Sequence, residues 1–182
     1  MSSVLILSGS PSATSRTERL ARSLMTRIAA RGVAADLLDL RTLPAEDLML
    51  ARFDAPSIVQ ATALLAAADG IVVATPIYKA AYSGLLKTFL DVLPQFGLRG
   101  KVVLPIATGG SMAHVLAIDY ALRPVLSSLD PLHVVSGLFV LDKQLTVLES
   151  GELQLETEIE QRLDGVLDQF LIGLRRVVAP GS

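Results

Sequence analysis

Short, almost wholly apolar runs alternate along this chain with longer segments in which apolar residues recur every three or four positions. The short runs are typical of buried parallel strands, and the longer segments are typical of helices that pack on one side. The expected strands are Val4–Leu7, Val33–Leu40, Ile71–Thr75, Lys101–Ala107 and Leu132–Val140. The expected helices run from Thr14 or Ser15 to about Ala30, from Ser57 to about Ala68, over Gly84–Leu93, from about Met112 to Leu129, and over Leu153–Val178.

Five strands alternating with helices predict one α/β domain over residues 1–182, with a doubly wound parallel sheet in the flavodoxin-like order 2-1-3-4-5. Residues 44–56 are expected to be irregular, and the pattern over residues 141–152 is ambiguous. In such sheets a ligand binds at the carboxyl ends of the strands, near the point where the strand order reverses. The loops to inspect are therefore 8–17, 76–83 and 108–114.

Composition narrows the classes of function. Hydrophobic residues make up 51% of the chain, but no apolar run approaches the roughly 20 residues of a membrane-spanning helix. The net charge is −2 without a basic block, so we expect neither nucleic acid nor a membrane as a partner. The N-terminal segment lacks the basic region of a signal peptide, and a cytoplasmic location is expected.

Metal and thiol chemistry have no obvious ligands in this sequence. There is no cysteine, which excludes disulfides, thiolate metal sites and cysteine catalysis. The two histidines and the carboxylates show no metal-site spacing, and His114 on its own is more often structural than catalytic. Any redox role must therefore come from a bound organic cofactor.

The first loop, residues 8–17, is rich in hydroxyls, carries Arg16 and directly precedes a helix. Free N–H groups and the dipole at a helix start attract anions, and Arg16 adds a charged donor. The loop has neither a Gly-Lys-Ser/Thr sequence nor a G-x-G-x-x-G spacing, so a monophosphate fits it better than a polyphosphate. An ordinary polar turn with a helix cap explains the same residues equally well.

The second and third loops can approach a flat ligand. In the second, Pro76 fixes the backbone, Tyr78 can lie against a ring and Lys79 can meet an anion, although edge packing for Tyr78 and solvation for Lys79 explain these residues too. In the third, Gly109 and Gly110 follow a buried strand and let main-chain N–H groups face a ligand.

Together these stretches resemble the NADPH-dependent FMN reductase family. GSPSATSRT is similar to its phosphate loop, TPIYKAAYSGLLKTFLD to its flavin-edge loop and ATGGSMAH to its second flavin loop. EDLMLARFDAP and AIDYALRPVLSSL extend the resemblance over about residues 4–140. These longer stretches are specific and resemble the reductase partner of two-component alkanesulfonate monooxygenases.

The resemblance implies FMN and NADPH as cofactors, with NADH possible, and a dimer or tetramer of identical chains. It implies that the phosphate of FMN meets Ser10, Ser15, Arg16 and Thr17, and that the ring and ribityl chain meet Pro76, Ile77, Tyr78 and Lys79. It also implies that the isoalloxazine meets Thr108, Gly109, Gly110 and Ser111. Reduced FMN would then pass to the partner monooxygenase.

The residues themselves favour a flavin with one open face. Aromatic residues make up only 4% of the chain and tryptophan is absent, so a flavin held between two large aromatic rings is not expected. An open face suits hydride transfer from a nicotinamide and suits a flavin that leaves as product. Two alternatives stay open: a quinone or azo-dye reductase that retains FMN, and a flavodoxin-like electron carrier. The nearly neutral charge disfavours the carrier.

Pro124 lies inside a helical pattern, four residues after Tyr120. Proline has no N–H for the carbonyl of Tyr120, so the helix must kink or form a π-bulge, and such bulges often mark functional sites. The resembled reductases carry an inserted residue at this place. We therefore predict a π-bulge near Tyr120, with Tyr120 close to the flavin loops at a subunit interface as a modulator of flavin release.

Overall fold

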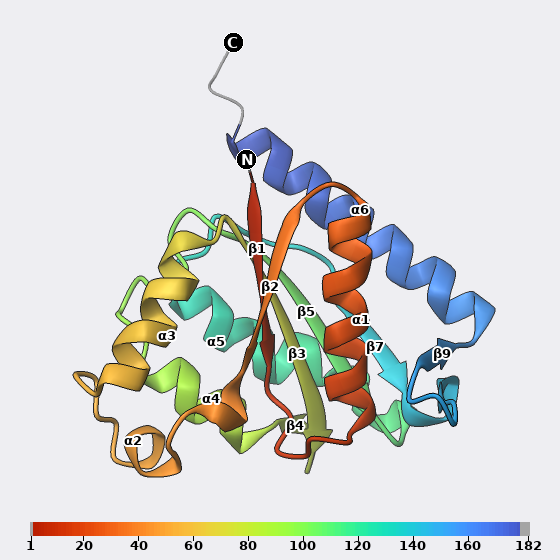
Figure 1. Cartoon of the computed structure of the whole chain (residues 1–182), viewed down its shortest axis with the longest axis horizontal. Coiled ribbons are helices and arrows are strands. Elements are labelled where there is room, and N and C mark those ends of the chain that lie inside the picture. Colours follow the sequence, from red (N-terminus) through yellow and green to blue (C-terminus); the bar gives the residue numbers. More distant parts are fainter. Residues whose placement is uncertain (1, 179–182) are drawn as a thin grey trace.

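A parallel sheet forms the centre of the molecule in the computed structural model, which describes residues 2–178. The sheet runs in the order β2-β1-β3-β5-β6, and β7 also pairs with β5 (Figure 1). Its strands are β1 (Ser3–Ser8), β2 (Ala34–Asp39), β3 (Gly70–Tyr78), β5 (Val102–Gly109), β6 (His133–Val134) and β7 (Leu138–Leu141). The predicted order 2-1-3-4-5 is confirmed, with the expected fifth strand divided into β6 and β7.

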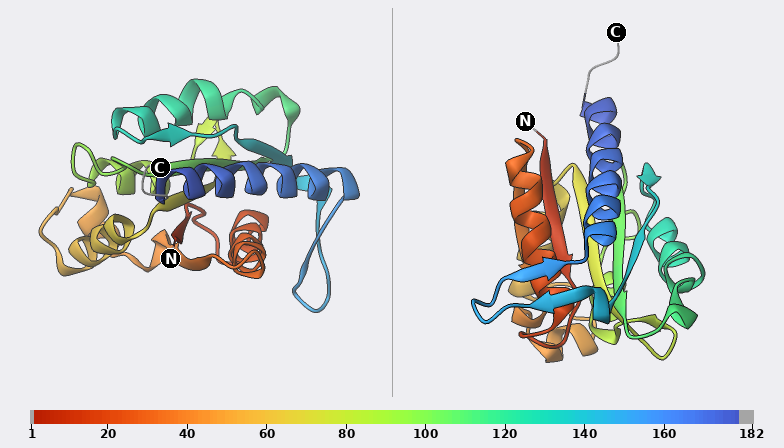
Figure 2. Two further views of the ribbon diagram at one scale, coloured as in Figure 1. Left: turned by 90° about the horizontal axis from the view of Figure 1, so that it is seen from above. Right: turned by 90° about the vertical axis from the view of Figure 1, so that its right-hand side faces the viewer.

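Helices cover both faces of this sheet (Figure 2). On one face lie α1 (Arg16–Ala30) and α6 (Thr157–Val178). On the other lie α3 (Pro56–Ala67), α4 (Gly84–Asp91) and α5 (Arg123–Ser128). Alternate residues of each central strand point to opposite faces, so every central strand contributes to both cores.

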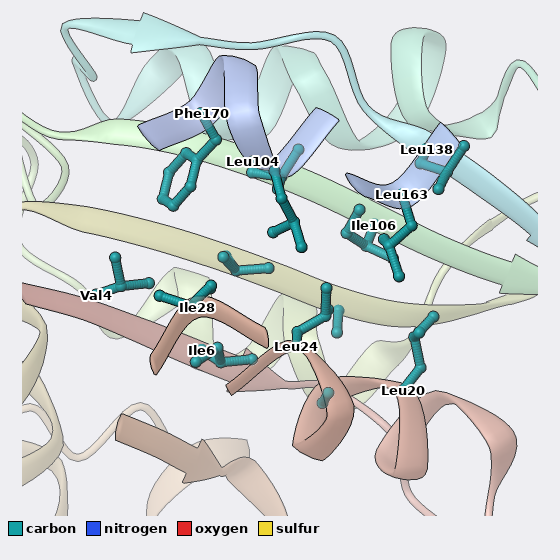
Figure 3. Packing of buried hydrophobic residues seen from close by; sticks show 14 of the residues in the cluster. Val4, Ile6, Leu20, Leu24, Ile28, Leu104, Ile106, Leu138, Leu163 and Phe170 are labelled. Atoms are coloured by element: carbon teal, nitrogen blue, oxygen red, sulfur yellow. The ribbon is translucent and has the colours of Figure 1, made fainter. Parts of the chain in front are cut away.

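The core under α1 and α6 shows how the helical period produces this packing. Leu20, Leu24 and Ile28 recur every four residues along α1 and are fully buried. They pack in one cluster with Val4 and Ile6 of β1 (Figure 3). Such burial of large aliphatic side chains supplies about 1.5–3 kcal/mol each to the folded state.

Several local expectations need correction. The predicted irregular segment 44–56 contains the short helix α2 (Ala45–Met49). The predicted start of the last helix, Leu153–Leu155, is strand β9, which pairs with β8 (Leu145–Val147) in a separate antiparallel hairpin. The apolar residues Leu153 and Leu155 alternate with a polar one, which is the period of a strand, and α6 begins only at Thr157.

The predicted long helix over residues 112–129 is also divided. It consists of the 3-10 turn η2 (Met112–His114), the π-helix η3 (Ile118–Leu122) and α5. The remaining short elements are η1 (Leu40–Thr42), β4 (Ala81–Tyr82) and η4 (Asp142–Gln144).

One arginine joins this divided helix to the interrupted edge of the sheet. Arg123 Nη1 donates to the carbonyl of Val134 at 3.0 Å, and Nη2 donates to that of Val135 at 3.3 Å. Its Nε donates to Asp119 Oδ1 at 3.0 Å. The guanidinium thus connects η3, the start of α5 and the segment between β6 and β7.

None of the helices over residues 2–178 combines the length and the apolarity needed to cross a membrane.

Lys101 caps a helix that lies far from it in sequence. The residue is 8% exposed, and its Nζ donates to the carbonyls of Ala66, at 2.9 Å, and Ala68, at the end of α3. Burial lowers the pKa of the Lys101 ammonium. The cap satisfies carbonyls that a helix end leaves without partners.

We predict that Lys101→Met lowers the free energy of unfolding by about 1–3 kcal/mol, because two carbonyls lose their donor. Urea unfolding followed by circular dichroism measures this loss. The control is Lys87→Met, which removes an exposed ammonium paired only with Asp91 and should change stability by less than about 0.5 kcal/mol. Equal stabilities of the two variants would contradict the capping role.

Candidate functional site

The three loops selected from the sequence meet at the carboxyl edge of the sheet. Parallel pairing places Ser8 of β1 opposite Ala74 of β3, and Pro76 of β3 opposite Thr108 of β5. The loops that follow these strands surround a hollow of about 180 Å³, called here the carboxyl-edge hollow. It is lined by Ser15, Arg16, Thr17, Pro76, Ile77, Tyr78, Thr108, Gly109, Gly110 and Asp142.

Hydroxyl groups organise the start of α1 at one end of this hollow. Ser15 is the N-cap, and its Oγ accepts from the N–H of Glu18 at 3.1 Å. Ser10 does not line the hollow, but its Oγ lies 2.7 Å from Ser15 Oγ in a hydrogen bond. Within residues 2–178, the N–H groups of Arg16 and Thr17 donate to no other group of the chain. These free donors at a helix start form an anion-binding arrangement.

Arg16 is tied to the hairpin β8–β9. Its Nε donates to the carbonyl of Leu145 at 3.0 Å, which leaves the two terminal nitrogens of an exposed guanidinium on the side of the carboxyl-edge hollow. No pattern in the sequence indicated that residues after 141 would support this cation.

Buried hydrogen bonds lock the loops to one another. Thr17 Oγ1 and Thr108 Oγ1 lie 2.6 Å apart, which joins the start of α1 to the end of β5. Ser83 donates its hydroxyl to the carbonyl of Gly9, and its N–H donates to Thr75 Oγ1 at 3.1 Å. The three loops are therefore fixed as one unit.

The second loop is a tight hairpin rather than the open loop expected over residues 76–83. Strand β3 continues to Tyr78 and turns into β4 through Lys79 and Ala80. Both turn residues have positive φ, +50° and +64°, as a two-residue turn that matches the twist of the strands requires. Lys79 lies at the tip and does not line the hollow, whereas the side chain of Tyr78 lies at its rim and is 51% exposed.

The third loop brings main chain close to the hollow. A Cβ on Gly109 would meet Cζ of the Phe139 ring at 2.9 Å, so any larger residue there would force this ring to shift. A Cβ on Gly110 would meet only Asp142 Oδ2, at 3.7 Å, so the space beside Gly110 is open. Ser111 caps η2 by accepting from the N–H of Ala113 at 3.2 Å and does not line the hollow.

Asp142 lines the hollow but was not predicted as a site residue from the sequence. It begins η4, directly after β7, and so follows a strand at the same carboxyl edge as the three loops. The position after the fifth strand was the available signal, but the ambiguous pattern over residues 141–152 obscured it.

The predicted π-bulge is confirmed as the π-helix η3, which contains Tyr120. The N–H of Arg123 donates to the carbonyl of Ile118, five residues back, and Pro124 has no N–H to offer Tyr120. The Tyr120 side chain is 79% exposed, and no group in residues 2–178 bonds its hydroxyl. Its contact with a second copy stays a prediction.

Larger hollows of about 610, 430 and 370 Å³ lie away from this edge. They are found beside β6 and α6, along the outer face of α1, and between α3 and the end of α4. In doubly wound sheets position relative to the strand ends matters more than size, so the carboxyl-edge hollow is the candidate site. No group of His, Asp or Glu side chains in the described part of the chain could hold a metal ion.

The residues of the carboxyl-edge hollow fit a flavin mononucleotide. Hydroxyls, free N–H groups and Arg16 suit a phosphate at one end. The apolar Ile77, the ring of Pro76 and the side-chain-free Gly110 suit a flat ring at the other. A volume of 180 Å³ is below the roughly 300–1,000 Å³ of pockets that enclose a ligand, so much of a flavin would lie open to solvent.

Comparisons with known proteins identify the family of this chain. A family model described as NADPH-dependent FMN reductase matches residues 2–146. The chain is 46% identical over 182 residues to FMN reductase (NADPH) of Pseudomonas putida strain KT2440, covering 98% of this chain and 92% of that protein. It is 44% identical over 173 residues to FMN reductase (NADPH) of Escherichia coli strain K12, covering 95% and 90%.

A solved structure is similar over nearly the whole chain. The apo form of the NADH:FMN oxidoreductase EMOB superposes with a TM-score of 0.86 at 40% identity, covering 95% of this chain and 90% of that one. The chain belongs to the NADPH-dependent FMN reductase family. The resemblance inferred from the three loops and the flavodoxin-like fold are thereby confirmed.

We predict that Arg16→Ala weakens FMN binding by about 1.5–3 kcal/mol and riboflavin binding much less, because riboflavin lacks the phosphate. Fluorescence titration of both flavins measures the two affinities. The variant also frees the carbonyl of Leu145, and a loosened hairpin should affect both flavins alike. Equal losses for FMN and riboflavin would therefore rule out a phosphate contact.

Proposed function

We propose that this chain oxidises NADPH, or NADH, to reduce FMN in the carboxyl-edge hollow, and that reduced FMN passes to a flavin-dependent monooxygenase of the alkanesulfonate type in the cytoplasm. The observation that carries the proposal is that a single hollow has an anion-binding helix start at one end and small and apolar residues at the other. It lies at the strand ends where doubly wound sheets bind nucleotides, in a member of an FMN reductase family.

The chain's own residues act by holding and orienting. Ser15, Arg16 and Thr17 would hold the phosphate, and Ser10 would support Ser15 through their hydrogen bond. Pro76, Ile77 and Tyr78 would line the ring, with Lys79 near its edge, while Thr108, Gly109, Gly110 and Ser111 would face its polar side. Hydride transfer between nicotinamide and flavin is the chemistry that the two cofactors supply, and the protein contributes proximity and orientation.

The shallow site supports release of FMN after reduction. Tyr78 is the aromatic residue in the lining, and half of its surface is exposed. A retained prosthetic group, as in a quinone or azo-dye reductase, would need deeper burial than 180 Å³ provides. The identity of the monooxygenase substrate rests on the resemblance to alkanesulfonate systems alone.

An exposed apolar stripe beside the site supports self-association. Met112, Leu116 and Tyr120 follow one another along the η2–η3 segment and are 56%, 56% and 79% exposed. Ile118 of the same segment packs with Ile77 of the flavin loop in a small apolar cluster. We therefore place a homo-oligomer contact on this stripe, with Tyr120 as a modulator of flavin release.

We predict that purified protein oxidises NADPH only when FMN is added, because the chain has no other redox group. Stopped-flow and steady-state absorbance at limiting FMN measure this dependence. The rate should rise with free FMN and saturate, and added quinone should not replace FMN. Full turnover with quinone by protein that carries its own flavin would favour the retained-flavin alternative.

We predict that Leu116→Glu shifts the chain toward monomer at micromolar concentration, because a carboxylate cannot be buried without a partner. Sedimentation velocity measures the assembly. Leu132→Glu is the matched control, since Leu132 is similarly exposed at 58% but lies outside the stripe. The same oligomer in wild type and both variants, or monomer in all three, would remove the stripe as an interface.

A further inference from the structure

Asp142 presents a carboxylate to the carboxyl-edge hollow without a neutralising partner. It is partly buried, and within residues 2–178 its carboxylate takes part in no hydrogen bond and no ion pair. Arg16 lines the same hollow, yet the two side chains form no ion pair with each other. The hollow therefore has a cation at the helix start and a separate, free anion beside Gly110.

The backbone around Asp142 is anchored on both sides, so the carboxylate is held in place. The N–H of Leu141 donates to Gln144 Oε1 at 3.0 Å, which closes the turn. Leu145 is 2% exposed in the main core, and its carbonyl accepts from Arg16 Nε. A short turn fixed at both ends holds the Asp142 carboxylate beside Gly110 of the third loop.

A fixed negative charge distinguishes the two oxidation states of a flavin. The oxidised ring is neutral, whereas the ring of reduced FMN carries a negative charge at neutral pH. The phosphate has the same charge in both states, so a contact between Arg16 and the phosphate does not distinguish them. Like charges repel at short range, so a carboxylate beside the ring disfavours the reduced form alone.

We propose that Asp142 weakens the binding of reduced FMN relative to oxidised FMN and so promotes release of the product. This inference rests on the proposed binding of FMN in the carboxyl-edge hollow. The two charges of the hollow then act differently: Arg16 holds the phosphate in either oxidation state, and Asp142 repels only the reduced ring.

The test compares the dissociation constants of oxidised and reduced FMN for wild type and Asp142→Asn, which removes the charge at nearly the same size. Anaerobic titration calorimetry with FMN and with dithionite-reduced FMN gives both constants. We expect the ratio of the constant for reduced FMN to that for oxidised FMN to fall about tenfold in the variant. The midpoint potential of the bound two-electron couple should rise by the corresponding ~30 mV.

Three further variants make the result specific. Asp142→Glu keeps the charge and should keep most of the wild-type ratio, and Asp142→Ser lacks both the charge and the amide and should reproduce the shift. Glu149→Gln removes an exposed charge outside the hollow and should leave the ratio unchanged.

An unchanged ratio in Asp142→Asn would overturn the proposal. Equal weakening of both oxidation states would also overturn it, because that is the result of a lost hydrogen bond to the ring rather than a lost repulsion. In either case the binding of FMN by wild type would leave the proposed function standing. Failure of wild type to bind either form would refute the proposed function and this inference together.

Discussion

In-register pairing of three fully buried parallel strands is the constraint on which this molecule depends. Strands β1, β3 and β5 lie side by side with nearly every residue buried, so sliding one strand would expose apolar residues or bury polar ones. Their fixed register determines where each strand ends and hence where each polar loop begins. Loops that are about 25 to 100 residues apart in sequence meet at one edge for this reason alone.

Side-chain hydroxyls then convert that meeting of loops into a defined hollow. The bonds between Thr17 and Thr108, and between Ser83 and the carbonyl of Gly9, are buried, where each polar group would be costly without its partner. The geometry of the site is therefore set before any ligand arrives. A preorganised, shallow site lowers the ordering cost of binding without enclosing the flavin, which suits a ligand that must enter and leave in each turnover.

The sequence predicted the parts of this structure that obey simple periods. The buried strands, the sheet order and most lining residues of the hollow follow from apolar runs and from the polar residues after them. The hairpin β8–β9 was missed because Leu153 and Leu155 precede Ile159 and Leu163 of α6 and can be read as the first turn of that helix. Asp142 was missed for a different reason: the pattern over residues 141–152 is ambiguous, and nothing local shows that β7 ends opposite Gly109.

The conformation of the β3–β4 hairpin could not be predicted from the types of residue in its turn. Two-residue hairpin turns with positive φ usually contain asparagine or glycine, whereas this chain has Lys79 and Ala80 there. The π-helix was predictable because proline acts locally: the missing N–H of Pro124 is a property of one residue, whatever the tertiary context.

The guanidinium of Arg123 also affects how the sheet can grow. An edge strand with free carbonyl groups is a template to which another extended chain can add. Here the edge strand β6 has two residues, and Arg123 already occupies the carbonyls of Val134 and Val135. A donor of the same chain thus already binds these two acceptors. Addition of a strand along β6 is therefore disfavoured, which lowers the risk of aggregation through this part of the sheet edge.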